Sequence, residues 1–242
     1  MSSILFYENP VGLNRELHKE VKIGTIKDYA FATKTNSVIL AGVEFIEATK
    51  EYPIVFAKIG EDKLVPVALL GLRDNENLFI DESFKWDARY IPAFVRRYPF
   101  VLAESESGEM TVCVDEVSAA FNAEDGQALF DEKGENSQFL QNALDFLRNY
   151  QGEFIRTEAF VSKLNKLDLF TEMSAKAEMT DGTSFVMNGL MIIDEQKLLA
   201  LDKNKVSELF KSGELAWVYA HLISLSNMGR LVDRIAARGS KE

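Results

Sequence analysis

The stretch YPIVFAKIGEDKLVPVALLGL occupies residues 52–72 and has the pattern of two β-strands joined by a turn. Its apolar runs, residues 52–59 and 64–72, are rich in Val, Ile and Leu, two of which are β-branched residues that favour strands. The intervening Gly60–Lys63 has the composition of a hairpin turn. This stretch therefore predicts an antiparallel hairpin in the first half of the chain.

The flanking segments extend this strand-and-turn pattern. Residues 73–77 (RDNEN) predict a turn, residues 78–80 a short return strand, and residues 100–116 a second hairpin. Residues 42–52 predict one short helix. All prolines of the chain lie in its first 99 residues: Pro10, Pro53, Pro66, Pro92 and Pro99. Because proline interrupts helices and central strands, the first half should consist of short strands and turns.

The second half has a different period. From Ser137 onward, apolar residues recur every three or four positions, which predicts an amphipathic helix capped by Asn136 or Ser137 and extending to about Leu167. Gly152 is a candidate for a bend in it. Residues 173–180 alternate in polarity, and Asp181–Gly182 is a strong turn signal, so a second-half hairpin is predicted.

Helices should complete the chain. Asp194 and Asp202 are in position to cap two of them, and Gly213 is in position to end the second. A third helical stretch places three arginines on one stripe at a spacing of four: Arg230, Arg234 and Arg238. The expected class is α+β, with antiparallel hairpins first and amphipathic helices plus one hairpin second.

No internal repeat or low-complexity segment is visible, and we expect a single domain over residues 1–242. Two lobes are conceivable within it, a strand-rich one at 1–116 and a helix-rich one at 136–242. Residues 104–135 would join them as an exposed acidic loop, because ten Asp or Glu residues there accompany only Lys133.

Composition restricts the partners. The formal net charge is −11, which repels nucleic acid phosphates and anionic membrane surfaces. The longest apolar stretches are far shorter than a membrane span, and the N-terminal residues lack the basic region of a secretory signal. We therefore expect a cytoplasmic protein that binds no nucleic acid, with export by another route left open.

Catalytic signatures are scarce. With two histidines, His18 and His221, and the single Cys113, the sequence predicts no metal site, no internal disulfide and no cofactor. We expect His18 at the surface, His221 packed in an apolar helix, and Cys113 acting as a small hydrophobe in a strand. Catalytic residues stay unknown, and the balance is against an enzyme.

The densest run of aromatics and arginines is WDARYIPAFVRRYPF, residues 86–100. A helix over residues 90–98 would align Tyr90, Phe94 and Tyr98 on one face. This run could fill the aromatic core, or it could bind a ligand or partner. The candidate binding residues are Trp86, Asp87, Tyr90, Arg96, Arg97 and Tyr98.

Residues 86–103 (WDARYIPAFVRRYPFVLA) closely resemble the signature segment of the SapC family of bacterial proteins. Upstream, EFIEATKEYPIVFAK and PVALLGLRDNENLFID are similar to its earlier blocks, and downstream GLMIIDEQKLLAL and GELAWVYAHLISLSNMGRL are similar to its later ones. The family takes its name from a member linked with a bacterial surface layer, and the resemblance carries over no catalytic residues.

The resemblance implies a non-enzymatic accessory or binding protein with a protein partner, linked to a surface layer or to outer-membrane uptake systems. The alternative is a small-molecule binder or an enzyme that uses the aromatic and arginine residues between positions 86 and 98. The oligomeric state stays open.

Overall fold

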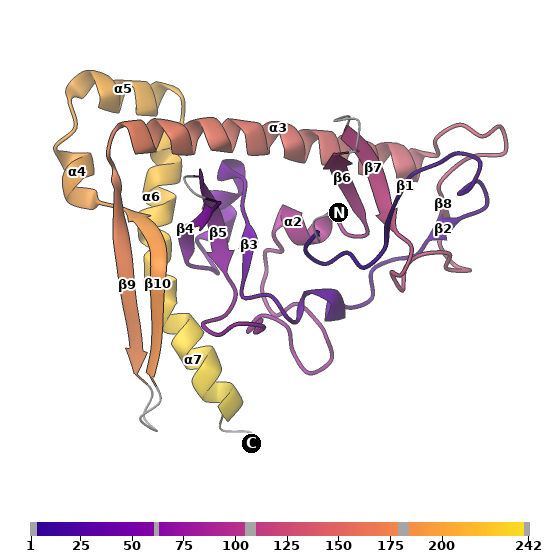
Figure 1. Ribbon diagram of the computed structural model, residues 1–242, viewed down its shortest axis with the longest axis horizontal. Helices are drawn as coiled ribbons and strands as arrows, with labels where there is room; N and C mark the ends of the chain where they lie inside the picture. Colours follow the sequence, from indigo (N-terminus) through magenta and orange to yellow (C-terminus); the bar gives the residue numbers. More distant parts are fainter. Residues whose placement is uncertain (1–3, 61–62, 105–109, 179–183, 240–242) are drawn as a thin grey trace. The chain divides into compact units, whose positions relative to one another are not determined.

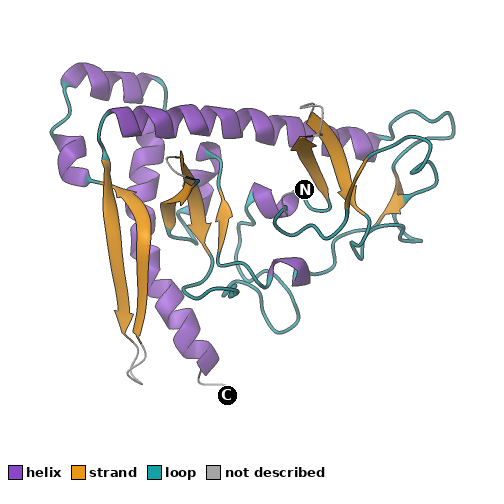
Figure 2. Cartoon of the chain, in the orientation of Figure 1, coloured by secondary structure: helices purple, strands orange, loops and turns teal. Residues whose placement is uncertain are grey.

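The computed structural model describes residues 4–60, 63–104, 110–178 and 184–239, and it confirms the α+β class (Figure 1, Figure 2). The strands are β1 (Pro10–Gly12), β2 (Lys22–Ile23), β3 (Ser37–Ile39), β4 (Ile54–Ile59), β5 (Lys63–Leu69), β6 (Phe100–Glu104), β7 (Met110–Asp115), β8 (Gln127–Ala128), β9 (Phe170–Glu178) and β10 (Ser184–Ile193). The α-helices are α1 (Phe45–Ala48), α2 (Ala93–Arg96), α3 (Gln138–Lys166), α4 (Glu195–Leu199), α5 (Lys203–Lys211), α6 (Glu214–Ser224) and α7 (Met228–Gly239). Short 3-10 turns are η1 (Ala30–Ala32), η2 (Gly42–Glu44) and η3 (Leu225–Asn227).

The chain forms two compact units, each built from two separate segments. Unit 1 comprises residues 1–32 and 94–152, and unit 2 comprises residues 33–93 and 153–242. These boundaries differ from the lobes at 1–116 and 136–242 suggested by the sequence, and a single domain stays a prediction.

Unit 2 contains an antiparallel sheet in the order β3-β5-β4-β10-β9. Helix α1 packs against α6, where Gly42 lies against the ring of Trp217 and Thr49 Oγ1 donates to the carbonyl of Ala220. Aromatic rings fill the core between these elements. They include Phe45, Tyr52, Phe56, Phe79, Phe160 and Trp217.

Unit 1 contains an antiparallel sheet in the order β1-β7-β6 and a small ladder of β2 with β8. The first part of α3 covers a core shared with the sheet, because Leu140 and Leu147 are buried together with Phe100 and Val114. Ser137 caps α3 as expected: its Oγ accepts from the backbone N–H of Leu140 at 3.1 Å.

The two units repeat one strand arrangement. In unit 2, β4 pairs with β5 so that Ile54 lies opposite Ala68; in unit 1, β6 pairs with β7 so that Phe100 lies opposite Val114. From Phe100 to Glu104, each residue of β6 and its partner in β7 follow their equivalents in β4 and β5 by the same number of sequence positions. The third strands also correspond, because β3 pairs with β5 as β1 pairs with β7.

The repeat continues into the hairpin turn that follows each sheet. The backbone N–H of Asp81 donates to the carbonyl of Lys85, and that of Asp131 donates to the carbonyl of Glu135. Each aspartate also caps two further N–H groups of its turn. The left-handed position holds Gly134 at φ +77° in one turn and Phe84 at φ +58° in the other. The turn geometry is therefore shared although the residues differ.

The expectation of no internal repeat was wrong. YPIVFA at residues 52–57 and YPFVLA at residues 98–103 share Tyr, Pro, Val and Ala at equivalent positions. The facing strands β5 and β7 differ more, because antiparallel pairing restricts backbone geometry and not the side chains that fill it. The common register shows that this short likeness belongs to a structural repeat.

Other expectations need correction. The helix predicted over residues 90–98 is only α2, so Tyr90, Phe94 and Tyr98 do not share a helical face. The acidic stretch 104–135 includes β7 and β8, and its Asp115 is buried. His18 is buried, not at the surface: its Nδ1 accepts from the N–H of Asn14 and its Nε2 lies 3.2 Å from Glu116. Helix α3 continues through Gly152.

Some turn predictions fall on residues that the structure does not describe. The turn at Asp181–Gly182 lies outside the described residues, as does the middle of the turn at Gly60–Lys63. The caps at Asp194 and Asp202 are confirmed, and Gly213 ends α5 with φ +78°.

We expect Gly42→Ala to lower the free energy of unfolding by about 1–3 kcal/mol, because its new Cβ would lie 2.4 Å from the Trp217 ring. Gly152→Ala is the matched control. Its Cβ meets nothing within 4 Å, so alanine should stabilise the helix by roughly 0.5–1 kcal/mol. Urea denaturation followed by tryptophan fluorescence measures both. Equal stability of the two variants would contradict the packing of Gly42, in η2, against Trp217 of α6.

Candidate functional site

The six candidate residues are divided between the two units. Trp86, Asp87 and Tyr90 belong to unit 2, whereas Arg96, Arg97 and Tyr98 belong to unit 1. Neither unit assembles them into one site, so each set is described in its own surroundings.

Two of the unit 2 candidates hold the core together. Trp86 is buried and its Nε1 donates to the hydroxyl of Tyr52 at 2.8 Å, while that hydroxyl donates to the carbonyl of Tyr90. The Tyr90 hydroxyl donates to the buried carboxylate of Glu44 at 2.7 Å. Burial raises the pKa of Tyr52 well above its usual value. These side chains satisfy one another's polar atoms.

The unit 1 arginines lie over aromatic rings. The guanidinium of Arg97 is 4.0 Å from the centre of the Phe94 ring, and the centres of the Tyr7 and Tyr150 rings lie within 6 Å of the same guanidinium. Arg96 is exposed and lies 5.3 Å from the centre of the Phe146 ring. Both contacts are cation–π interactions, which stabilise the fold by about 0.5–2 kcal/mol each.

Tyr98 lines a smaller pocket in unit 1. Its ring stacks on Phe31 with centroids 4.0 Å apart, and its hydroxyl is 3.3 Å from Oδ2 of the buried Asp115. Burial raises the pKa of Tyr98 to about 12, so the hydroxyl is protonated at neutral pH. The pocket has a volume of about 410 Å³ and also includes Lys27 and Asp28 at its rim.

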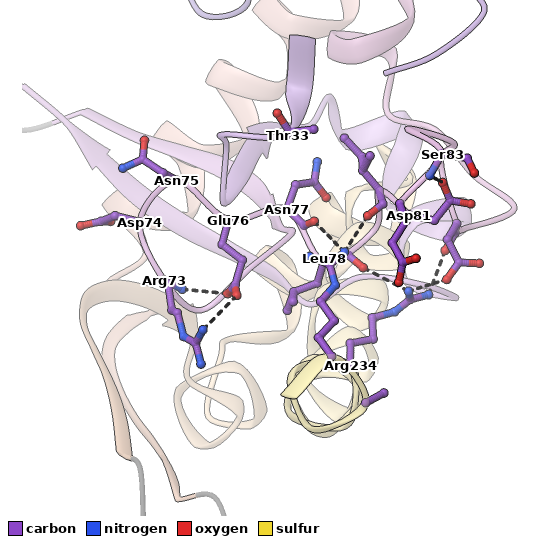
Figure 3. Close-up of a pocket in the computed structure, with 15 residues that line it drawn as sticks. Thr33, Arg73, Asp74, Asn75, Glu76, Asn77, Leu78, Asp81, Ser83 and Arg234 are labelled. Atoms are coloured by element: carbon purple, nitrogen blue, oxygen red, sulfur yellow. Dashed lines mark hydrogen bonds and ion pairs between the residues drawn. The ribbon is translucent and has the colours of Figure 1, made fainter. Parts of the chain in front are cut away.

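A second pocket lies in unit 2, beside α7, and we call it the α7 pocket (Figure 3). It has a volume of about 1150 Å³. Of the six candidates, only Asp87 lines it. Its wall carries both signs of charge, supplied by Arg73, Asp74, Glu76, Asp81, Glu82, Asp87, Arg234 and Arg238.

Two of the three arginines in the stripe predicted on the last helix, Arg234 and Arg238, bind the loop that forms this pocket, whereas Arg230 binds Lys50 and Glu51. Arg234 donates to Oδ2 and the carbonyl of Asp87 at 2.7 and 2.8 Å, and it lies over the Phe79 ring. Arg238 donates to the carbonyls of Asn77 and Ile80. Figure 3 shows Arg234 extending from α7 toward Leu78, whose carbonyl it also contacts.

The pocket wall therefore offers carboxylate acceptors, and the arginines on the wall already have partners. Arg73 pairs with Glu76, and Arg234 pairs with Asp87. Asp81 Oδ1 accepts from the N–H groups of Ser83 and Lys85, and Asp74 is exposed on the wall. Such a wall suits a hydrogen-bond donor or a cationic group. The spacing of the arginines was visible in the sequence, but the segment that they bind was not.

His221 is buried and has a structural role. The N–H of Ile193 donates to its Nε2 at 3.0 Å, and its Nδ1 lies 2.8 Å from the carbonyl of Ile54. Only the neutral imidazole with a proton on Nδ1 satisfies both bonds. Burial lowers the pKa of His221 to about 4, although the bond to Ile54 opposes this. The sequence interpretation of a packed histidine is confirmed.

Cys113 is buried in β7, and burial raises the pKa of its thiol. Within the described ranges, no three side chains of His, Cys, Asp or Glu type are grouped as metal ligands would be. No helix among the described residues has the length and apolar character of a bilayer-crossing segment.

We expect Arg234→Ala to lower the free energy of unfolding by about 2 kcal/mol, because it leaves a buried carbonyl and a carboxylate without their donor. Arg148→Ala is the control, since Arg148 makes one exposed i,i+3 pair with Asp145 and should contribute less than about 0.5 kcal/mol. Urea denaturation of both variants tests this. A similar small loss for both would show that α7 does not fasten the loop.

His221 predicts a pH dependence. The unfolded chain protonates this histidine near its usual pKa of 6.5 and the folded chain only near 4, so acidification through this window favours unfolding. The loss should reach roughly 3 kcal/mol across the window at 1.36 kcal/mol per pKa unit. His221→Asn keeps a donor and an acceptor and should show a flatter stability profile between pH 7 and pH 5. Parallel profiles for the two proteins would contradict the prediction.

Comparison with known proteins places the chain in one family. The SapC family profile matches residues 13–231 of the 242 residues. No curated protein and no solved structure matches the chain. The family match covers both units and all six candidate residues, and the chain belongs to the SapC family.

Proposed function

We propose that this chain is a non-enzymatic accessory protein that binds another protein, and that its role is linked to a bacterial surface layer or to an outer-membrane uptake system. The proposal rests on family membership for the setting and on one surface of unit 2 for the binding.

The observation that carries the proposal is the exposed side of α6. This helix is mostly apolar, a composition typical of a fully buried helix, and its Glu214, His221 and Ser224 are buried. Yet Ala216, Tyr219 and Ile223, which lie on one stripe, are exposed. Ile223 keeps 62% of its surface accessible. A helix with this composition is expected to be covered on its remaining side.

The helix that packs on α6 has exposed apolar residues too. Val43 and Ile46, at η2 and α1, are 45% and 51% exposed. Together with Ala216, Tyr219 and Ile223 they form what we call the α1/α6 face. Tyr219 combines an apolar ring with a polar hydroxyl, as residues at the centre of protein interfaces often do.

A partner of different charge fits this face better than a second copy. The chain has a net charge of −11, and two copies would repel each other over any large contact. A protein with an apolar patch surrounded by basic side chains would be attracted and would cover the face.

The candidate residues support a binding role over a catalytic one. Trp86 and Tyr90 are engaged with Tyr52 and Glu44, and His221 is held neutral by two backbone groups. The aromatic and arginine stretch is thereby accounted for by the fold.

The second candidate function is a small-molecule binder that uses the α7 pocket. Its volume of about 1150 Å³ and the presence of Asp87 on its wall favour this alternative. A ligand there would raise the melting temperature by mass action in a thermal-shift screen, whereas the proposed function predicts no such response.

We expect Tyr219→Asp and Ile223→Asp each to abolish capture of a specific partner by the tagged protein from extracts of the source organism. Both side chains are exposed, so circular dichroism and melting temperature should change little. The captured protein is identified by mass spectrometry and purified, and its affinity should fall at least about tenfold, or about 1.4 kcal/mol.

Phe210→Asp is the matched control, because Phe210 is 73% exposed on α5, outside the α1/α6 face. This variant should keep the affinity of the unaltered protein. Equal loss in all three variants, or binding unaffected by any of them, would rule out the face as the interface. A ligand-induced thermal shift without a protein partner would favour the alternative.

A further inference from the structure

We propose that the free edge of β6 in unit 1 is a second binding site, which takes an extended segment of a partner protein as an added antiparallel strand. The inference rests on the proposed function only in that the occupant is a protein. It is independent of the α1/α6 face.

The structural repeat supplies the argument. In unit 2 the outer edge of β4 is covered by β10, which places Met191 opposite Phe56 and Leu190 opposite Ala57. The register of the ladders makes Leu102 the equivalent of Phe56 and Ala103 the equivalent of Ala57. In unit 1, β6 ends the sheet on this side, and no described strand pairs with its outer edge.

Backbone polarity shows which groups face that edge. The N–H of Asp115 donates to the carbonyl of Pro99 at 2.9 Å, so alternate residues of β6 point toward β7. Phe100 and Leu102 therefore direct their N–H and carbonyl groups outward. The same geometry holds in β4, where the N–H of Leu69 donates to the carbonyl of Pro53.

The first outward residue of each strand is already satisfied within its own unit. Ile54 donates to Ser224 Oγ and accepts from His221. Its equivalent Phe100 donates to the carbonyl of Arg97 and accepts from the Tyr7 hydroxyl. The next outward residue differs: Phe56 meets β10, whereas no described residue hydrogen-bonds with the outward groups of Leu102.

Exposure agrees with an open edge. Phe56 is fully buried, but its equivalent Leu102 is only partly buried. An exposed strand edge with unpaired backbone groups is a template for another strand, and addition of a strand is a common mode of peptide recognition.

The occupant should be apolar at its centre and basic at its ends. The residues of β10 that occupy the equivalent place are Leu190 and Met191. The net charge of the chain is −11, so a basic segment is attracted and a second copy of the chain is repelled.

The probe is a synthetic peptide with the sequence of β10, residues 184–193, between two lysines at each end. Amide hydrogen exchange of the full chain is measured with and without it. In the free protein, the Leu102 amide should exchange far faster than the Phe56 amide. Saturating peptide should slow exchange at Leu102 at least about tenfold.

Leu102→Pro and Leu102→Val form a matched pair, because both shorten the side chain and only proline removes the outward N–H. Proline is tolerated on an edge strand where its nitrogen faces solvent. The valine variant should keep saturable peptide binding, and the proline variant should lose it while its melting temperature stays close to that of the valine variant.

The inference is overturned by a Leu102 amide that is already as protected as that of Phe56, by absence of saturable binding, or by protection confined to the β9 edge. Equal binding to both Leu102 variants also overturns it. The α1/α6 variants should bind the peptide normally, so failure at β6 and failure of the proposed function are distinguishable.

Discussion

Antiparallel backbone pairing that begins at two Tyr-Pro pairs is the interaction on which the rest of this structure depends. The carbonyls of Pro53 and Pro99 each accept from the backbone N–H of the last residue of the facing strand, Leu69 of β5 and Asp115 of β7, at 2.9 Å. Each pairing starts a three-stranded sheet with the same register. A small sheet becomes stable when it gains further strands or packs against a helix. Unit 1 packs its sheet against α3, and unit 2 extends its sheet with β10 and β9.

The polar side chains that stand out in the sequence mainly satisfy this backbone. His221 and Ser224 bind the edge of β4 at Ile54, and Arg234 and Arg238 bind carbonyls of the loop beside α7. Buried N–H and carbonyl groups without partners are costly, so these side chains are needed for stability wherever no strand completes the pairing. The same reasoning identifies the outward groups of Leu102 as one place among the described residues where pairing is incomplete.

The binding surfaces that we propose are those that the described fold leaves uncovered. Inside unit 2 the aromatic residues Tyr52 and Trp86 are buried in the core, while Tyr219 and Ile223 on α6 remain accessible. An accessible apolar helix face and an unpaired strand edge are both surfaces that proteins use to bind proteins. The partner that we propose is basic because the chain has a net charge of −11.

The sequence by itself determined the α+β class, the hairpin at residues 52–72, the caps at Ser137, Asp194 and Asp202, and the burial of His221, because these depend on local propensity and periodicity. Only the tertiary structure decided that Trp86 and Arg97 belong to different units, that His18 is buried, and that two sheets share one register. Those features depend on contacts between residues distant in sequence, which no local pattern records. The same is true of the open edge at Leu102, since only the fold shows which strands lie beside β6 among the described residues.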